Sequence, residues 1–329
     1  MPDWSKIEQK ISSSVNRAFR IINQARIAGG DTNQAYQIKG LFDDESQPVQ
    51  FFIKFNQQNR LDMFEAEADG LKEIEKSQTI RVPHVIASGI DGNQSYLILE
   101  NLSLTAAGNA SVKQLGEQLA KMHQTVFSQS LSPLSIISQS ITSQSITSQS
   151  TTARSTTPRF GWWRDNTIGS SQQPNTQTDH WVDFWREQRL GFQLDMAKQN
   201  GVGPSLINKG EALLNNLDSF FIDYEVQASL LHGDLWSGNY GYINKGEPVI
   251  FDPAVYYGDR EADMAMTELF GGFPAEFYSA YNETWPLNKG YQQRKTLYNL
   301  YHILNHANLF GGGYVMQAEN MIDQLNRYT

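Results

Sequence analysis

The N-terminal third of the chain alternates short apolar runs with polar turns, a pattern typical of β-strands. Residues 35–41 (AYQIKGL) and 49–55 (VQFFIKF) flank the turn-rich stretch FDDESQP and predict an antiparallel hairpin. Further short strands are predicted at residues 84–90 and 95–101, which the turn at residues 91–93 (DGN) separates. We therefore expect this part of the chain to form a β-sheet.

Two segments of helical spacing accompany these strands. Asp62 followed by Glu65 resembles a capping box and predicts the start of a helix that runs to about residue 76. Ser111 followed by Gln114 predicts a second helix start in the same way. Both helices would pack their apolar face against neighbouring elements.

The second half of the chain is mainly helical in pattern. Residues 181–199 and the aromatic-rich segments from residue 261 onward have helical spacing. Between them lie two short apolar runs, SLLHG at 229–233 and PVIFD at 248–252, and each ends in a small polar cluster. These runs predict strands that carry polar loops.

Length and composition allow two lobes with a sizeable core. The chain has 329 residues, about twice the ~150 that serve as a prior for one domain. It is 40% hydrophobic and 12% aromatic, which excludes a wholly disordered chain. We predict an α+β protein with an N-terminal lobe over residues 1–102 and a C-terminal lobe over residues 103–329.

One tract differs from the rest of the sequence. Residues 128–158 are dominated by Ser, Thr, Gln and Ile, and SQSIT or SQSTT recurs at positions 138, 143 and 148. Such a composition offers too little apolar surface to offset the entropy lost on ordering. We predict a flexible insertion; a docking or modification tract is the alternative.

Charge and cysteine content exclude several classes of function. Lys and Arg number 26 against 35 Asp and Glu, which gives a net charge of −9. This balance argues against general binding of nucleic acids or anionic membranes, although a local cationic pocket with a metal ion could hold a polyanion. The absence of Cys excludes disulfides, thiolate catalysis, iron–sulfur clusters and Cys-type zinc sites. No secretory or transmembrane segment is visible, so a cytoplasmic protein is predicted.

The most specific segment is LLHGDLWSGNYGY, which PVIFDPA follows. Asn239 lies five residues after Asp234, and Asp252 lies thirteen residues after Asn239. Phosphoryl transfer from Mg·ATP needs a carboxylate that orients the acceptor and oxygen ligands that hold metal against the phosphates. Protein-kinase-like enzymes place these groups at such a spacing, each after a strand. The alternative is that these are polar residues of ordinary turns. That explanation would suffice for one of the three residues, but it accounts poorly for all three at this spacing.

A lysine and a glutamate in the first lobe fit the same chemistry. Lys54 lies inside the apolar run FFIKF, where a lysine is costly unless it is paired. Glu67 lies on the following helix, where it could pair with Lys54 and orient it toward the ATP phosphates. Taken alone, the two would be an edge-strand charge and a solvated helix residue.

Two more segments are candidates for nucleotide contacts. Gly29 and Gly30, in IAGGDTNQAY, could let backbone N–H groups approach phosphates, although a Gly-Gly pair is usually a simple turn. Glu100, Asn101 and Leu102 end the last strand of the lobe, where a kinase hinge would present backbone groups to adenine.

Together these residues resemble the fructosamine kinase (ketosamine-3-kinase) family, distant relatives of aminoglycoside and choline kinases. The resemblance runs from about residue 20 to 325, and only the 128–158 tract looks foreign. The segments that carry it are LHGDLWSGN (231–239) with its Trp236, FDPAVYYGDREADMAMTELFGGF (251–273), FGWWRDNTIG (160–169), Gln173, Asn175 and WVDFWREQRL (181–190).

The resemblance implies a two-lobed, protein-kinase-like fold and ATP-dependent phosphorylation of the sugar 3-hydroxyl of ketosamines, in protein or metabolite deglycation. Asp234 would accept the proton, and Asn239 and Asp252 would bind Mg²⁺. Lys54 and Glu67 would position the phosphates. Two alternatives stay open: another small-molecule kinase of the aminoglycoside or choline kinase type, and a pseudokinase that only binds nucleotide.

Several other residues have a functional and a structural interpretation. Trp236 could pack on a sugar or anchor its loop, and Trp162 and Asn166 could contact substrate or serve packing. Family analogy suggests that Asp263 braces the catalytic-loop backbone. His302 and His306 are four residues apart on a predicted helix, and core histidines explain this spacing better than a metal site. Nothing in the sequence predicts the oligomeric state.

Overall fold

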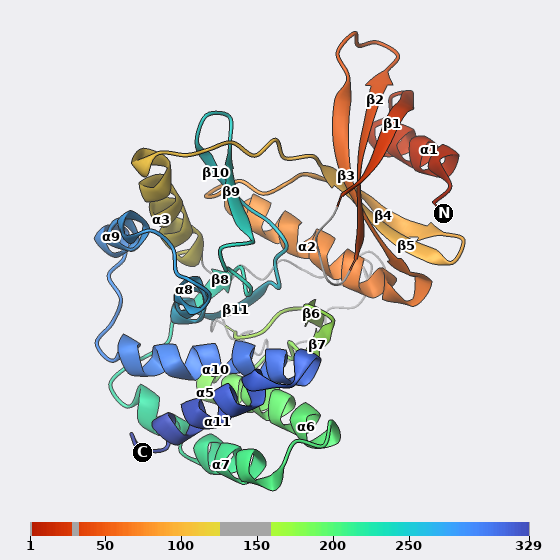
Figure 1. Cartoon of the computed structure of the whole chain (residues 1–329). Helices are drawn as coiled ribbons and strands as arrows, with labels where there is room; N and C mark the ends of the chain where they lie inside the picture. The colour runs from red at the N-terminus through yellow and green to blue at the C-terminus, as the bar shows by residue number, and fades with distance from the viewer. Residues whose placement is uncertain (1, 28–32, 126–158, 329) are drawn as a thin grey trace, which may run out of the picture.

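The computed structural model describes residues 2–27, 33–125 and 159–328, which form two lobes joined by the segment between β5 and α3 (Figure 1). The first lobe is built around a five-stranded antiparallel sheet of order β1-β2-β3-β5-β4. The second lobe is mainly helical, and the predicted α+β class is confirmed. The Gly29–Gly30 pair and the 128–158 tract lie outside the described residues.

The sheet of the first lobe forms where alternating apolar residues were recognised. Its strands are β1 (Phe19–Ile27), β2 (Gln34–Phe42), β3 (Val49–Gln57), β4 (Val85–Asp91) and β5 (Gln94–Glu100). Ile38 and Ile53 are fully buried on the face that α1 (Trp4–Val15) covers. In the central strand β3, Lys54 pairs with Ala35 of β2 and Leu97 of β5, which places a lysine in the middle of the sheet.

The first lobe also holds helix α2 (Leu61–Ser77), which the short helix η1 (Gln58–Arg60) precedes. The predicted capping box at Asp62 is wrong: Arg60 is the N-cap residue and no side chain caps this end. The η1 turn brings the chain into helical conformation earlier, so Asp62 lies in the first turn, where its charge still favours the helix N-terminus.

The start predicted for the next helix is wrong for a similar reason. Helix α3 (Asn109–His123) has Gly108 as its N-cap, and Ser111 is its third residue. Glycine is an acceptable N-cap because it reaches the required backbone conformation at little cost. The helix therefore begins before Ser111, the residue that the sequence pattern predicted as its cap.

The second lobe packs helices around a set of short strands (Figure 1). Its helical segments are α5 (Trp181–Phe184), the π-helical η2 (Trp185–Gly191), α6 (Phe192–Gln199), α7 (Pro204–Asn215), η3 (Leu217–Phe221), α8 (Arg260–Leu269), α9 (Ala275–Thr284), α10 (Tyr291–Phe310) and α11 (Gly313–Leu325). Its strands are β6 (Asn166–Ile168), β7 (Ser171–Gln173), β8 (Ala228–Leu231), β9 (Tyr240–Ile243), β10 (Glu247–Ile250) and β11 (Tyr256–Asp259).

The main hydrophobic core extends across the boundary between the lobes. Phe64 and Leu71 of α2 belong to the same buried cluster as Trp185, Tyr298 and Leu304 of the helical lobe. Gly70 lets α2 approach closely, because a Cβ there would lie 3.1 Å from a methyl group of Val255. Helix α2 is thus part of both lobes in packing terms. Among the described residues, no helix is long and apolar enough to cross a membrane.

Candidate active site

Three charged side chains from different parts of the chain meet in the cleft. Lys54 Nζ of β3 donates to Glu67 Oε1 of α2 and to Asp252 Oδ1 of the loop after β10, each at 2.7 Å. Burial alone would lower the pKa of Lys54, but the two carboxylates outweigh it, and the pKa lies above its ordinary value. The lysine is therefore held in its charged form, and the predicted pairing with Glu67 is present.

Asp252 has an unusual backbone conformation. Its φ angle is 58°, in the left-handed region that non-glycine residues rarely adopt. Directly after it, Ala254 N donates to His232 O at 2.8 Å, which ties this loop to the loop after β8. Gly233 is required at this contact: its φ is 83°, and a Cβ would lie 2.1 Å from Ala254 O. Asp252 is thus held at the contact between the loop after β10 and the loop after β8.

Asp263 of α8 fixes the loop that carries Asp234. Its carboxylate accepts from His232 N at 2.7 Å and from Gly233 N at 2.8 Å, and His123 Nε2 lies 3.1 Å away. Burial raises the pKa of Asp263, but its hydrogen bond and attraction to His123 and the other donors bring the pKa below its ordinary value. This is the bracing role that family analogy suggested.

His232 joins the two functional loops through its ring. Its Nε2 lies 2.9 Å from Phe251 O, and Asp234 N lies 3.3 Å from its Nδ1. Burial lowers the pKa of His232, so the ring is neutral, with the proton on Nε2 and the lone pair on Nδ1. Its position supports the loop and leaves both nitrogens engaged.

Asp234 is a partly buried carboxylate whose loop Asn239 closes. Asn239 Nδ2 donates to Asp234 O at 2.8 Å and to Asp234 Oδ2 at 3.3 Å, so the five-residue spacing closes a tight loop. Burial, with the nearby charges of Asp252 and Asp263, raises the pKa of Asp234 to about 7, and the Asn239 hydrogen bond opposes this. A pKa near the working pH suits proton transfer.

The oxygen donors present fit a magnesium ion that is shared with phosphates. Asn239 uses its Nδ2 to hold Asp234, and its Oδ1 makes no hydrogen bond to the described residues. Asp252 presents its second carboxylate oxygen, since Lys54 takes the first. Among the described residues, no group of three or more His, Asp or Glu is arranged so that it could hold a metal ion by itself. Magnesium commonly binds one or two protein oxygens and takes its other ligands from phosphates and water, so these two donors suffice.

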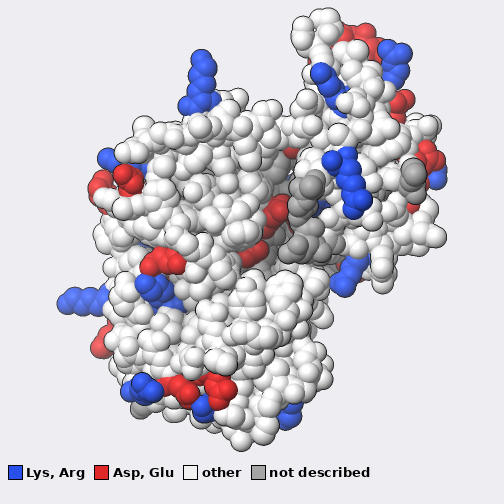
Figure 2. Space-filling model, in the orientation of Figure 1, with Lys and Arg blue, Asp and Glu red and all other residues white. Residues whose placement is uncertain are grey.

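Two cavities meet at Asp234. The smaller, about 170 Å³, is lined by the charged residues and by Asn239, and Figure 2 shows acidic side chains gathered in the hollow between the lobes. The larger, about 660 Å³, opens on the other side of Asp234. Its lining residues are Asn56, Gln57, Arg60, Ile168, Gly169, Ser170, Asp234, Trp236, Met266, Phe270, His302, Asn305, His306, Leu309, Phe310 and Tyr314.

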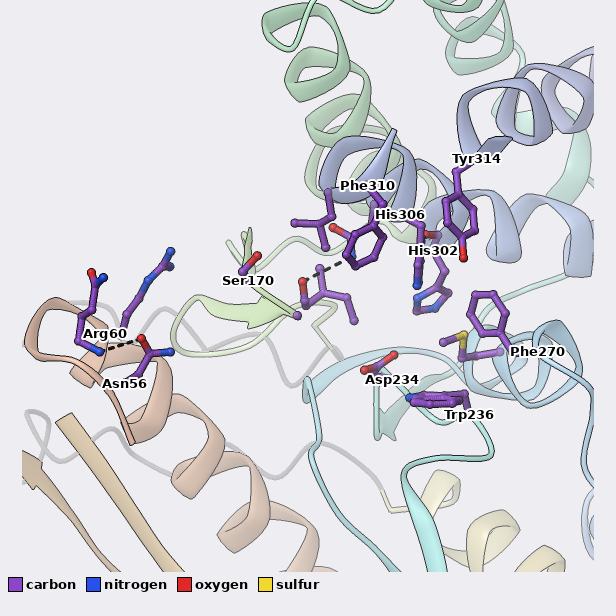
Figure 3. Close-up of a pocket in the computed structure, with 16 residues that line it drawn as sticks. Asn56, Arg60, Ser170, Asp234, Trp236, Phe270, His302, His306, Phe310 and Tyr314 are labelled. Atoms are coloured by element: carbon purple, nitrogen blue, oxygen red, sulfur yellow. Dashed lines mark hydrogen bonds between the residues drawn. The ribbon is translucent and has the colours of Figure 1, made fainter. Parts of the chain in front are cut away.

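The larger cavity has an aromatic wall on the helical lobe (Figure 3). Trp236 lies beside Asp234 and near Phe270, which follows α8, and His302 and His306 of α10 and Tyr314 of α11 line the same cavity. The spacing of the two histidines favoured core positions over a metal site; His302 is indeed buried and His306 half-buried, and both also line this cavity. Burial, with the neighbouring His306, lowers the pKa of His302 to about 3, so its ring is neutral. Their four-residue spacing fits a cavity wall as well as a core, so no signal in the sequence could separate the two.

The other predicted substrate contacts lie in different places. Trp236 is 38% exposed and lines both cavities. Trp162 is only 2% exposed, packs in the hydrophobic core and lines neither cavity, so we do not retain it as a substrate contact. Asn166 lines the smaller cavity, but its amide is engaged by backbone and by other carboxamides.

The predicted nucleotide hinge follows β5 directly. Glu100 N donates to His84 O and Asn101 N donates to Gln50 O, so these two donors are used within the lobe. Leu102 N has no partner among the described residues, which makes it the N–H of this segment available to a base. None of the three lines either cavity described above.

Comparison with known proteins agrees with this geometry. A family model described as fructosamine kinase matches residues 3–132 and 138–327. The chain belongs to the fructosamine kinase family. A probable ketoamine kinase of Synechocystis is 44% identical over 328 residues, which cover 98% of this chain and 97% of the relative. A chloroplastic protein-ribulosamine 3-kinase of Arabidopsis thaliana is 37% identical over 94% of this chain and 85% of its own length.

Solved structures confirm the protein-kinase-like fold of this family member. A crystal structure from Haemophilus somnus, named as a candidate fructosamine-3-kinase, has a TM-score of 0.79 at 28% identity and covers 98% of this chain and 97% of its own. The gentamicin-APH(2")-IIa complex has a TM-score of 0.55 at 12% identity, with 98% and 95% coverage. The second likeness concerns the fold alone.

Proposed function

We propose that this protein transfers the γ-phosphoryl group of ATP to the 3-hydroxyl of ketosamines, the adducts that sugars form on amines. The observation that carries the proposal is the position of Asp234, which lines both the small charged cavity and the large aromatic one. A group at this boundary can meet a hydroxyl from one side and a phosphoryl group from the other.

The charged cavity is suited to the nucleotide phosphates. Lys54 is kept in its charged form and directed by Glu67, so it can contact the phosphate oxygens without further rearrangement. Asn239 and Asp252 would hold Mg²⁺, which supplies compensation for the phosphate charge. Gly29 and Gly30 are proposed phosphate contacts, and the backbone at Glu100, Asn101 and Leu102 is proposed to bind adenine.

Asp234 would orient the acceptor hydroxyl and take its proton as the oxygen attacks phosphorus. The carboxylate is held by Asn239 and by the braced loop, so it needs little reorganisation. Positioning of this kind, together with electrostatic stabilisation by the charged cavity, is the main contribution that a protein makes to phosphoryl transfer. Asp263 and His232 act only through the loop backbone.

The aromatic cavity is suited to a sugar that carries an amine. Trp236 offers an indole face beside Asp234, and sugars and cations both pack well on such faces. The names of the relatives, ketoamine kinase and protein-ribulosamine 3-kinase, support a ketosamine acceptor and the 3-position. We also propose that the protein serves deglycation in the cytoplasm, where a 3-phosphate would let the adduct decompose to the free amine, phosphate and a dicarbonyl sugar.

The test is to incubate the enzyme with Mg·ATP and ketosamines of different sugar length, including ribulosamine and fructosamine adducts of lysine. The phosphate position is assigned by NMR, and free lysine is followed over time. The proposal expects a 3-phosphate on at least one adduct, followed by release of lysine. Phosphorylation of aminoglycosides or choline without any ketosamine would indicate another small-molecule kinase. ATP binding with no turnover of any acceptor would indicate a pseudokinase.

A further inference from the structure

The hairpin formed by β6 and β7 carries buried carboxamides that the proposed chemistry does not use. Asn166 is 7% exposed, Gln173 is fully buried, and Asn175, just after the hairpin, is 1% exposed. Carboxamides are rarely buried unless their polar atoms are hydrogen-bonded, because desolvation is costly. Their partners therefore indicate what the hairpin holds in place.

Two of these carboxamides hold the backbone directly after Asp252. Asn166 Nδ2 donates to Val255 O at 2.8 Å, and Gln173 Nε2 donates to Ala254 O at 3.0 Å. The same Gln173 Nε2 also lies 2.8 Å from Asn166 Oδ1, so the two amides are joined to each other. The hairpin thus forms hydrogen bonds to the carbonyls two and three residues after Asp252.

A second layer of hydrogen bonds fixes the hairpin itself. Asn175 Nδ2 donates to Asn166 Oδ1 at 2.9 Å, and Arg189 of the π-helical segment donates to Asn175 Oδ1 at 2.7 Å. Tyr301 of α10 donates to Gln173 Oε1 at 2.7 Å. The acceptors of both hairpin carboxamides are therefore used, and the network connects the loop to η2 and α10 of the second lobe.

Asp252 needs such support from its backbone. Its side chain is 46% exposed, so packing does not fix it, and the hydrogen bond from Lys54 is its contact in the site. A left-handed conformation at a non-glycine residue is unfavourable and persists only where the surroundings enforce it. The hydrogen bonds to the carbonyls of Ala254 and Val255, together with the bond from Ala254 N to His232 O, hold the backbone of Asp252 in this conformation.

We propose that Asn166 and Gln173 are positioning residues for the metal site: by holding the carbonyls of Ala254 and Val255, they keep the carboxylate of Asp252 directed at Lys54 and at Mg²⁺. This inference rests on the proposed role of Asp252 as a metal ligand, but not on the identity of the acceptor. It replaces the substrate contact predicted for Asn166. Residues that orient a metal ligand typically change metal affinity by about 10–100-fold when mutated.

The test uses the neutral substitutions Gln173→Met and Asn166→Leu, which remove the donors without adding charge beside the site. Asn282→Leu is the matched control, because Asn282, near the end of α9, also bonds two backbone groups, Tyr278 O and Leu287 N, and forms no hydrogen bond with the loop of Asp252 among the described residues. Two quantities are measured in the full-length protein: ADP affinity by calorimetry with and without Mg²⁺, and the Mg²⁺ concentration for half-maximal turnover.

Both hairpin variants should need about tenfold more Mg²⁺ for half-maximal turnover, and the gain in ADP affinity from Mg²⁺ should fall by a similar factor. ADP affinity without metal should stay within about twofold, and saturating Mg²⁺ should restore most of kcat. The Asn282 variant should match the wild type.

An unchanged Mg²⁺ response in folded variants would overturn the proposal. So would an equal loss of ADP affinity with and without Mg²⁺, or failure of both variants to fold, since either would make the network a matter of general stability. The calorimetric readout needs no acceptor, so a failed ketosamine assay leaves this test intact.

Discussion

The two ends of the cleft are built on different physical principles. The end that we propose for the nucleotide phosphates, the phosphate end, brings together Lys54, Glu67 and Asp252 from both lobes, with charges paired at 2.7 Å. The end that we propose for the acceptor, the acceptor end, is a larger cavity with an aromatic wall, in which Trp236 and Phe270 face the α10 and α11 side chains. Charged side chains determine the geometry of the first end, and neutral aromatic rings determine the shape of the second.

This difference teaches where catalysis and selectivity reside. A phosphoryl group demands a few charged groups in narrow geometry, and burial makes each of them strong. The acceptor that we propose, an amine-bearing sugar, would meet a wall made mainly of neutral side chains. Substitutions should therefore have large effects on rate at the first end and modest effects on acceptor affinity at the second.

The largest effect is expected from Asp252→Ala. It removes a proposed magnesium ligand and one of the two partners of Lys54, so turnover should fall by roughly 10³-fold or more. EDTA should abolish the wild-type reaction as well. Steady-state kinetics would measure both, with the exposed Asp195→Ala as control. Undiminished activity in EDTA or in the variant would contradict the proposal that Asp252 binds Mg²⁺ at the phosphate end.

Asp234→Asn should lower kcat by roughly 10²–10⁴-fold, because the amide can still accept Asn239 but cannot take a proton. The fold should be intact by circular dichroism, and ATP binding should largely survive, since Asp234 is assigned to the acceptor. Wild-type turnover by the folded variant would show that Asp234 is not the general base.

Trp236→Ala should act on the acceptor alone. We expect the KM for a ketosamine to rise roughly 3–10-fold, equivalent to about one aromatic contact, with the KM for ATP within about twofold. The control is Trp163→Ala, whose indole is 48% exposed beside Arg164 and lines neither cavity. A rise in the KM for ATP instead would mean that the indole serves the phosphate end.

The smallest effect is expected from replacing residues 132–156 with a short Gly/Ser linker. Lengthening or shortening a connection changes closure entropy only slowly, and this tract offers little to bury. Tm and kcat should stay near wild type in thermal melts and kinetics. A clear loss of kcat with unchanged Tm would indicate that the tract reaches one end of the cleft.

The phosphate end could be predicted from the sequence because its signals are local. Asp234 and Asn239 lie in one loop, and Lys54 lies in a strand whose apolar neighbours make a lone charge conspicuous. The strands β2 and β3 were predicted within two residues of their observed ends, because their alternation is strong. The catalytic roles themselves stay predictions.

The acceptor end could not be predicted in the same way. Its wall combines the Trp236 loop with His302, His306 and Tyr314, which meet only after α10 and α11 pack. No spacing within the sequence distinguishes a cavity wall from a core face on such a helix. The buried partners of Asn166 were equally invisible, because hydrogen bonds between distant loops leave no periodic pattern.

The packing of α2 has a consequence for how the chain can be divided. Phe64 and Leu71 of this helix belong to a buried cluster that also contains Trp185 and Leu304 of the helical lobe, yet the helix precedes β4 and β5 in the chain. A fragment that ends at residue 102 would therefore expose the part of α2 that contacts the helical lobe, and the remaining fragment would lose the same contacts. We therefore expect this shared cluster to couple the unfolding of the two lobes.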